Sequence, residues 1–253
     1  MNNKISVLIP ELPKSDKIVP YLNKIDSSHW YTNFGPLLVS FEQRLADLFR
    51  VDSKNIATAN NATVALSLAL ANFDFISDKK KYCIVPSWTF IATPLAVLNA
   101  GFIPIFADVD FKTWQLTPEK VFQCLKELSI CISEVHAVVP VCAFGQPIEY
   151  EQWITFLEQT GVHVLIDAAA SFDSVQQSDL PVNCEIPLVI SLHATKTLGV
   201  GEGSLVISRN QDFILNFKKR TNFGFWGSRN SLLIGTNAKL SEYVAAVGLA
   251  ALD

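Results

Sequence analysis

The sequence has little charge and no strong excess of either sign. Its 253 residues include 20 Lys and Arg against 24 Asp and Glu, which gives a formal net charge of −4 at pH 7. This balance gives no reason to expect binding to nucleic acid or to anionic membranes. Only 17% of the residues are charged and 49% are hydrophobic, which excludes a disordered or fibrous protein. The length is enough for one large domain or two ordinary ones.

Cysteine is also scarce, and its spacing is not that of a disulfide or metal framework. The five cysteines stand at positions 83, 124, 131, 142 and 184, and no two form a Cys-x-x-Cys pair. An odd number without metal-like spacing is typical of a reducing compartment, and no metal site is predicted. The apolar stretch before Pro10 is too short for a signal peptide. We therefore expect a cytoplasmic protein.

One apolar run needs separate treatment, because residues 90–109 are about as long as a membrane span. The run contains Asn99, Gly101 and Pro104 and ends near Asp108. These residues favour a helix, a turn and a buried strand over a membrane-spanning helix. No glycine- and serine-rich linker, charge block or repeat divides the rest of the chain.

What the sequence does have is an alternation of short apolar runs with helical patterns. The runs are rich in Val and Ile, which is typical of strands covered on both faces. They occupy residues 56–59, 82–85, 104–107, 137–141, 162–166, 188–191 and 204–208. Helical spacing occurs over residues 38–49, after Thr117 and Pro118, and around Trp153. This alternation predicts an α/β fold with a mainly parallel sheet flanked by helices, whose ligands bind at the carboxyl ends of the strands.

Two charged residues closely follow predicted strands. Asp167 ends an apolar run, where a buried carboxylate is costly unless a cation or hydrogen-bond donors meet it. Lys196 follows another run and precedes a Gly-Glu-Gly turn, which could hold its amine in a partly desolvated site. Desolvation makes a lysine amine a nucleophile toward carbonyls. A helix N-cap or strand-end ion pair for Asp167, and a solvated loop charge for Lys196, are the structural alternatives. The glycine-rich turn lacks the spacing of a P-loop.

Two further segments also follow strands. Asn60, Asn61 and Thr63 stand at the start of a smooth helical run, where free backbone N–H groups can bind an anion. Ordinary capping by asparagine is the alternative. Trp88 and Phe90 could stack on a ring or belong to the core. An anion cradle, a stacking aromatic, a carboxylate and a lysine are together the parts of a pyridoxal-phosphate site.

The order of these motifs resembles the DegT/StrS family of sugar aminotransferases, which are fold-type I pyridoxal-phosphate enzymes. The likeness runs from about Phe34 to the last residue, through FGPLLVSFEQRLADLF, NNATVALSLAL, VPSWTFIATPLAVLNAGFIPIFADVD, VLIDAAASFDS, SLHATKTLGVGEGS and GTNAKLSEYVAAVGLAALD. The resemblance implies that residues 1–253 form the large cofactor-binding domain, with residues 1–30 as an amino-terminal arm. The sequence ends within the helix that leads into the family's small carboxyl-terminal domain, which we therefore expect to be absent.

The resemblance also implies roles for single residues. Lys196 corresponds to the lysine that holds the cofactor and moves protons. Asp167 corresponds to the aspartate that keeps the pyridine nitrogen protonated. Phe90 corresponds to the aromatic that stacks over the ring, with Trp88 as its rival. Four family residues contact the cofactor's phosphate and correspond to Ala62, Thr63, Ser191 and Asn237. The residue that corresponds to Asn237 reaches the phosphate of the neighbouring subunit, which implies a homodimer. The loop that lines the substrate entrance corresponds to the segment with Tyr31, Phe34 and Gly35.

The implied reaction moves an amino group from glutamate to a ketone on a nucleotide-linked sugar, in amino-sugar or polysaccharide biosynthesis such as that of O-antigen. Four positions depart from the family pattern. Ala170 replaces a Gln or His that contacts the cofactor, Ala62 and Ser204 replace glycines, and Lys239 replaces an arginine. Two alternatives therefore stay open. One is a truncated, non-catalytic homologue that keeps the fold and can still bind the cofactor, and the other is an unrelated α/β binding protein.

Overall fold

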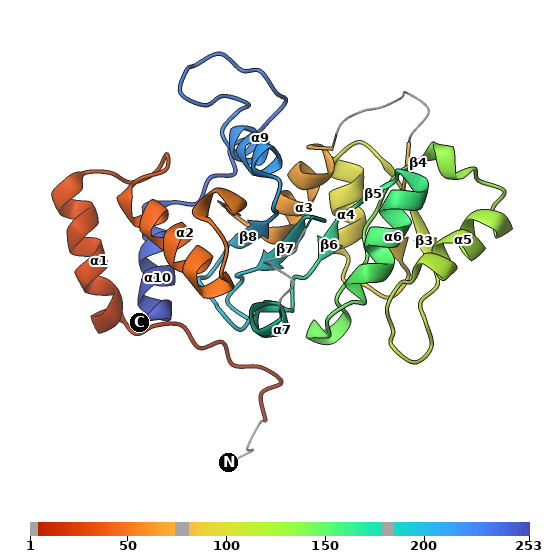
Figure 1. Ribbon diagram of the computed structural model, residues 1–253. Helices are drawn as coiled ribbons and strands as arrows, with labels where there is room; N and C mark the ends of the chain where they lie inside the picture. Colours follow the sequence, from red (N-terminus) through yellow and green to blue (C-terminus); the bar gives the residue numbers. More distant parts are fainter. Residues whose placement is uncertain (1–4, 74–80, 179–184) are drawn as a thin grey trace.

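The computed structural model describes residues 5–73, 81–178 and 185–253, so Cys184 lies outside the described residues. The α-helices are α1 (Ser15–Ser28), α2 (Pro36–Phe49), α3 (Ala62–Leu70), α4 (Ala92–Asn99), α5 (Pro118–Glu127), α6 (Tyr150–Thr160), α7 (Phe172–Gln177), α9 (Gln211–Thr221) and α10 (Glu242–Leu252). The short 3₁₀ helices are η1 (Ser53–Asn55), η2 (Ile132–Glu134) and η3 (Ala143–Gly145). The strands are β1 (Ile56–Ala59), β2 (Tyr82–Pro86), β3 (Ile103–Ala107), β4 (Val135–Val138), β5 (His163–Val164), β6 (Ile166–Asp167), β7 (Leu188–Ser191) and β8 (Ser204–Ile207). In Figure 1, α1, α2 and α10 gather at one end of the molecule and α5 and α6 at the other.

The strands form one mainly parallel sheet, as the sequence predicts. Two four-stranded parts have the orders β1-β8-β7-β6 and β3-β2-β4-β5. They are joined because the N–H of Leu165 donates to Val138 O (3.0 Å) and the N–H of Asp167 to Pro140 O (2.9 Å). The apolar run at 162–166 therefore forms two short strands that continue in the same direction and are separated at Leu165. Among the described strands, β8 is the one that runs against the others, because it pairs antiparallel with both β1 and β7.

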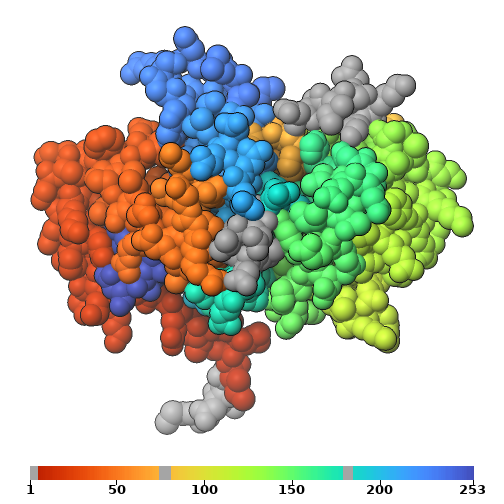
Figure 2. All heavy atoms as spheres, in the orientation of Figure 1, coloured from red at the N-terminus to blue at the C-terminus, as the bar shows by residue number. Residues whose placement is uncertain are grey.

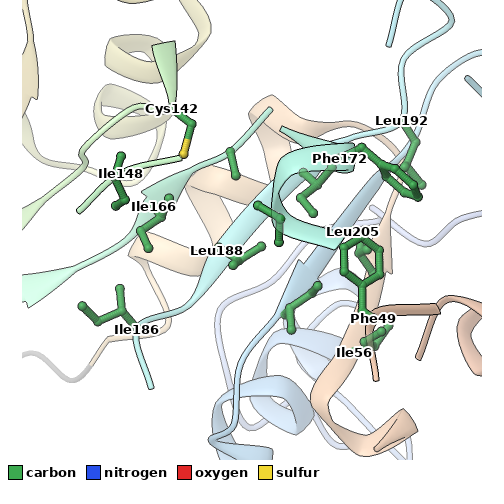
Figure 3. Close-up of a cluster of buried hydrophobic side chains, with 14 of the residues drawn as sticks. Phe49, Ile56, Cys142, Ile148, Ile166, Phe172, Ile186, Leu188, Leu192 and Leu205 are labelled. Atoms are coloured by element: carbon green, nitrogen blue, oxygen red, sulfur yellow. The ribbon is translucent and has the colours of Figure 1, made fainter. Parts of the chain in front are cut away.

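Helices cover the sheet on both faces and create two hydrophobic cores. One core lies under α3, α4 and α9 and includes Cys83 and Val85, while the other lies under α2, α5, α6, α7 and α10 and includes Ile84. This alternation along β2 follows from the period of two in a strand. Figure 3 shows part of the second core, where the rings of Phe49 and Phe172 meet edge to face with centroids 5.2 Å apart.

The apolar run at residues 90–109 has the predicted order of elements, but its strand is not buried as predicted. It forms α4, a turn and β3. Among the described residues, no helix is long and apolar enough to cross a membrane. The expectation that the strand is buried is wrong, because Ile103 and Phe106 are 48% and 54% exposed. The reason is that β3 is an edge strand, paired only with β2.

Candidate active site

The carboxyl ends of the parallel strands border a cavity of about 720 Å³. Its wall is formed by the start of α3, the end of β6, the end of β7 and the turn before β8. Six of the residues singled out in the sequence line this one cavity, namely Ala62, Thr63, Phe90, Asp167, Ser191 and Lys196. The fold therefore brings together residues that are more than 130 positions apart in the chain.

Asp167 is a buried carboxylate held by hydrogen bonds. Asp167 is only 5% exposed. Thr93 Oγ1 donates to Oδ2 (2.7 Å), and the N–H of Ala169 donates to Oδ1 (3.1 Å). Burial raises the pKa of Asp167, and the bonds from Thr93 and Ala169 and the charge of Lys196 lower it in part. Within the described part of the chain Asp167 forms no ion pair, so the strand-end ion pair is wrong, and the carboxylate has room for a cationic partner.

The start of α3 is both capped and open to an anion. Asn61 Oδ1 accepts from the N–H of Val64 (2.9 Å), which confirms the capping role of asparagine. Among the described residues, no acceptor meets the N–H groups of Ala62 and Thr63, both of which line the cavity. The hydroxyl of the buried Ser191 accepts from the N–H of His193 (3.2 Å) and keeps its own proton available. These donors at a helix start form a cradle suited to a phosphate.

Lys196 projects into the same cavity from the segment after β7. In the part of the chain that the structure describes, its Nζ makes no hydrogen bond. Nearby, His193 Nδ1 accepts the N–H of Thr195 (3.2 Å), which leaves Nε2 to face Oε1 of Glu202 at 3.6 Å. The other potential nucleophile is Cys142, but burial raises the pKa of this thiol to about 12, so it stays protonated. Lys196 is the amine in the cavity lining that can form a bond to a carbonyl carbon.

A second cavity of about 470 Å³ adjoins the first, and both are lined by Phe90, Asp167, Ala169 and Lys196. Trp88 lines only the second cavity. Trp88 is 45% and Phe90 78% exposed, so the alternative that these aromatics belong to the core is wrong. Their exposure comes from their position in the turn after β2, beyond the layer of helices.

The other predicted site residues lie elsewhere. Asn237 is exposed and lines neither cavity, and its Oδ1 accepts from Lys239 Nζ (2.7 Å). The ring of Tyr31 stacks on Tyr243 with centroids 6.2 Å apart. Phe34 meets Trp226 edge to face at 4.8 Å. None of these residues reaches Lys196 within this chain.

The segment before α2 is shaped by a distant carboxylate. Glu242, 1% exposed, accepts from the N–H groups of Leu37 (2.8 Å) and Leu38 (2.9 Å) and so caps α2. Its own N–H donates to Tyr31 O (3.0 Å). Gly35 is buried beside it, and a Cβ there would stand 2.6 Å from Glu242 Cδ. Only glycine therefore allows this close approach of α10 to the start of α2.

The sequence reasoning missed three residues that shape the site. Thr93 holds Asp167, and its signal is a polar residue in the first turn of an otherwise apolar stretch of helix that follows a strand. Trp114 and Phe144 approach Trp88, with ring centroids 4.7 Å and 6.1 Å away. Aromatics in turns that follow strands were their only signal, because contacts between separate turns leave no periodic pattern.

The groups present fit pyridoxal phosphate. The cradle at α3 suits its phosphate, and the buried carboxylate of Asp167 lacks the cation that a protonated ring nitrogen would supply. Lys196, without a hydrogen-bonded partner among the described residues, lines the same cavity. Ala170 is exposed and contributes no polar group to the second cavity, so the departure from the family pattern at this position stands.

Comparisons with known proteins give one consistent result. The profile of the DegT/DnrJ/EryC1/StrS aminotransferase family matches residues 14–253. A dTDP-4-amino-4,6-dideoxy-D-glucose transaminase of Shigella dysenteriae is 30% identical over 100% of this chain and 66% of its own length. The crystal structure of a Bacillus cereus protein provisionally assigned as a PLP-dependent aminotransferase is 34% identical, with a TM-score of 0.85 over 97% of this chain and 65% of that one. The structure of DesI with its TDP-sugar product is 31% identical, with a TM-score of 0.81 over 97% of this chain and 60% of that one.

The share of each relative that is covered limits what these matches transfer. The chain spans about three fifths to two thirds of the length of the relatives it matches. The fold is that of pyridoxal-phosphate-dependent aminotransferases, and the matched part includes both cavities.

Proposed function

The chain belongs to the DegT/DnrJ/EryC1/StrS aminotransferase family, whose cofactor is pyridoxal phosphate, and we propose that it transfers an amino group to a nucleotide-linked keto sugar. Glutamate is the proposed amino donor. The observation that carries the proposal is the single cavity shared by the buried Asp167, Lys196 and the open start of α3. Nucleotide-linked sugars are named for related transaminases, such as those that act in the formation of dTDP-4-amino-4,6-dideoxy-D-glucose and GDP-perosamine.

Five residues of the cavity have a proposed task. The N–H groups of Ala62 and Thr63, with the hydroxyls of Thr63 and Ser191, bind the phosphate. Asp167 holds the ring nitrogen in its protonated form. Because burial disfavours the charged form of this carboxylate, the cationic ring nitrogen beside it is what favours that form. Pyridoxal phosphate supplies an electron sink for the carbon that loses its proton. Nζ of Lys196 holds the cofactor and then removes that proton from the donor and returns one to the acceptor.

A homodimer with shared active sites is part of the proposal. Asn237 is exposed and lines neither cavity of its own chain, which leaves it available to the phosphate of a second subunit. Two exposed apolar areas support such an association. One is on and just before α4, with Ile91, Leu95 and Leu98 at 60%, 43% and 53% exposure. The other is the loop between α9 and α10, which projects from the body in Figure 2 and carries Ile234 at 90% exposure.

The remaining proposals concern context. We propose that residues 1–253 act as the cofactor-binding domain and that Tyr31, Phe34 and Gly35 border the substrate entrance when two subunits meet. A role in polysaccharide or O-antigen biosynthesis and a cytoplasmic location are further proposals. Four cysteines, at 83, 124, 131 and 142, are free thiols, which supports the location. A non-catalytic homologue is not favoured, because the carboxylate, the lysine and the phosphate cradle surround one cavity.

The decisive variant is Lys196→Ala in the full protein. The wild type should take up pyridoxal phosphate and show its absorbance, and borohydride should abolish that absorbance by reducing the bond to Lys196. The variant should lose amino transfer from glutamate to dTDP- and GDP-linked keto sugars by at least about a thousandfold, since it lacks the nucleophile and proton carrier. Lys126→Ala, on the exposed side of α5, is the matched control and should leave both signals unchanged. A wild type that stays colourless after pyridoxal phosphate is added would contradict the proposal.

A further inference from the structure

Three aromatic side chains from separate turns meet beside Lys196. Trp88 follows β2, Trp114 follows β3 and Phe144 follows β4, so each lies beyond the carboxyl end of a parallel strand. The centroids of the two tryptophan rings are 4.7 Å apart, and Phe144 lies 6.1 Å from Trp88 and 6.2 Å from Trp114. We call these three residues the aromatic cage. Aromatic groups at this spacing form one continuous apolar surface.

The cage is held at a cost to the backbone. Trp114 and Phe144 have φ values of 61° and 54°, in the left-handed region that bulky residues rarely adopt. The N–H of Trp114 donates to Asp110 O (2.8 Å), which fixes the first turn. Gln115 Nε2 donates to the carbonyls of residues 146 and 147 (3.2 and 3.1 Å) and ties the two turns together. Such strain persists where the surrounding structure imposes it, and active sites and ligand sites are among the places where it gathers.

The cage residues are exposed rather than packed in the core, and two of them line a cavity. Trp88 and Trp114 are each 45% exposed and Phe144 is 75% exposed. Trp88 and Phe144 line the 470 Å³ cavity together with Lys196 and Asp167, and Trp114 supports Trp88 from its edge, with an interplanar angle of 77°. Apart from Lys196 and Asp167, every described residue in this lining is uncharged. The part of a ligand that enters here is therefore neutral and has an apolar face.

We propose that Trp88 and Phe144, supported by Trp114, form a stacking platform for the sugar ring of the amino acceptor. This inference rests on the proposed function, and it assigns specificity for the sugar substrate to the 470 Å³ cavity. A pyranose presents C–H groups on its ring faces, which pack on aromatic rings. Glutamate is an open chain with two carboxylates and gains nothing from this surface. The cage thus determines affinity for the sugar substrate and leaves the reaction with the amino donor unchanged.

One assay compares both substrates with the same signal. In the reverse direction, dTDP-4-amino-4,6-dideoxy-D-glucose or GDP-perosamine donates the amino group, and glutamate donates it in the forward direction. Both change the absorbance of the bound cofactor in a single turnover. In Trp88→Ala and Phe144→Leu, the half-saturating concentration of the amino sugar should rise about five- to tenfold, while that of glutamate should stay within about twofold. Phe111→Ala is the matched control, because Phe111 is 93% exposed on the turn that carries Trp114 and lines neither cavity.

A binding measurement gives a readout independent of turnover. After borohydride has fixed the cofactor on Lys196, calorimetric titration with the amino-sugar nucleotide and with dTDP or GDP alone reports equilibrium affinity. The platform predicts weaker binding of the sugar nucleotide by Trp88→Ala, unchanged binding of the bare nucleotide, and recovery with Trp88→Phe.

Each other outcome overturns the platform. Equal losses for glutamate and amino sugar would show a structural role, and weaker binding of bare dTDP or GDP would place the base on the cage. A change in oligomeric state in Trp88→Ala would show that the cage contacts a second subunit. A wild type that reacts with glutamate but with neither amino sugar would exclude a sugar on the platform while the cofactor chemistry stands. A wild type that fails with glutamate as well would contradict the proposed function itself.

Discussion

The two halves of the candidate active site are built in different ways. The half at the start of α3 consists of backbone N–H groups and two hydroxyls, those of Thr63 and Ser191, on a regular helix and strand. The aromatic cage consists of exposed rings on turns, and two of its three residues have left-handed backbones. Asp167 and Lys196 line the cavities of both halves.

This difference matches what each half is proposed to bind. A phosphate is small, charged and always the same, so donors on regular secondary structure can be fixed in place for it. A sugar ring is neutral and varies between substrates, and contacts on turns can vary without changes to the sheet. The contrast teaches that the cofactor half depends on the fold itself, whereas the cage depends on three loops, two of which have strained backbones.

The strongest test of the contrast is Asp167→Asn, because Asp167 serves both halves. We expect amino transfer to fall about a thousandfold, since a neutral amide cannot stabilise a protonated ring nitrogen. The cofactor-free variant should, in contrast, be more stable at neutral pH than the wild type. Urea unfolding of the cofactor-free proteins measures this difference, and Asp173→Asn on the exposed surface of α7 is the matched control.

The sign of the stability change follows from the pKa of Asp167, which burial raises above 3.8. The folded protein then holds this proton more tightly than the unfolded chain. The stability of the wild type therefore falls as the pH rises from about 3.8 through the raised pKa. The Asn variant lacks this component, so its advantage should grow over that range. A variant less stable than the wild type at pH 7 would show that the carboxylate stabilises the empty site.

Much of the cofactor half could be predicted from the sequence, because it follows local rules. A short apolar run followed by Asn61 and a helical pattern places an N-cap at a strand end. Asp167 and Lys196 likewise stand where buried strands end, and parallel strands bring those ends to one edge of the sheet. These groups therefore line one cavity, although the sequence could not show that Thr93 would orient the carboxylate.

The rest depended on contacts between distant segments. The exposure of Phe106 follows from the position of β3 at the sheet edge. The order of the strands in a sheet cannot be predicted from the apolar runs that form them. The left-handed backbones of Trp114 and Phe144 are imposed by neighbouring turns, and neither residue type signals them. The cap on α2 comes from Glu242, about two hundred positions away.

A second test breaks the cage through its backbone. Gly145 follows Phe144 with φ of 80°, and a Cβ there would stand 2.7 Å from Ala170 O. Gly145→Ala should lower the free energy of unfolding by about 2–3 kcal/mol, from left-handed strain and overlap together. Gly161→Ala is the matched control, because its φ is 64° and a Cβ would meet nothing within 4 Å. It should cost only the strain, about 1 kcal/mol. Equal losses in the two variants would show that the cage turn can move aside.

The smallest expected change in stability comes from a variant that tests the cage without affecting the phosphate half. Phe144→Asn removes an exposed ring and replaces it with a residue that tolerates the left-handed region at φ of 54°. Relief of strain and loss of the ring contacts oppose each other, so the free energy of unfolding should change by less than about 1 kcal/mol. The affinity for the amino-sugar nucleotide should nevertheless fall, while the phosphate half keeps its affinity for pyridoxal phosphate. Denaturant unfolding and titration of the same preparation give both values. A loss of stability of about 2 kcal/mol or more would mean that Phe144 is kept for packing, and the strain at the cage would then have no connection with substrate binding.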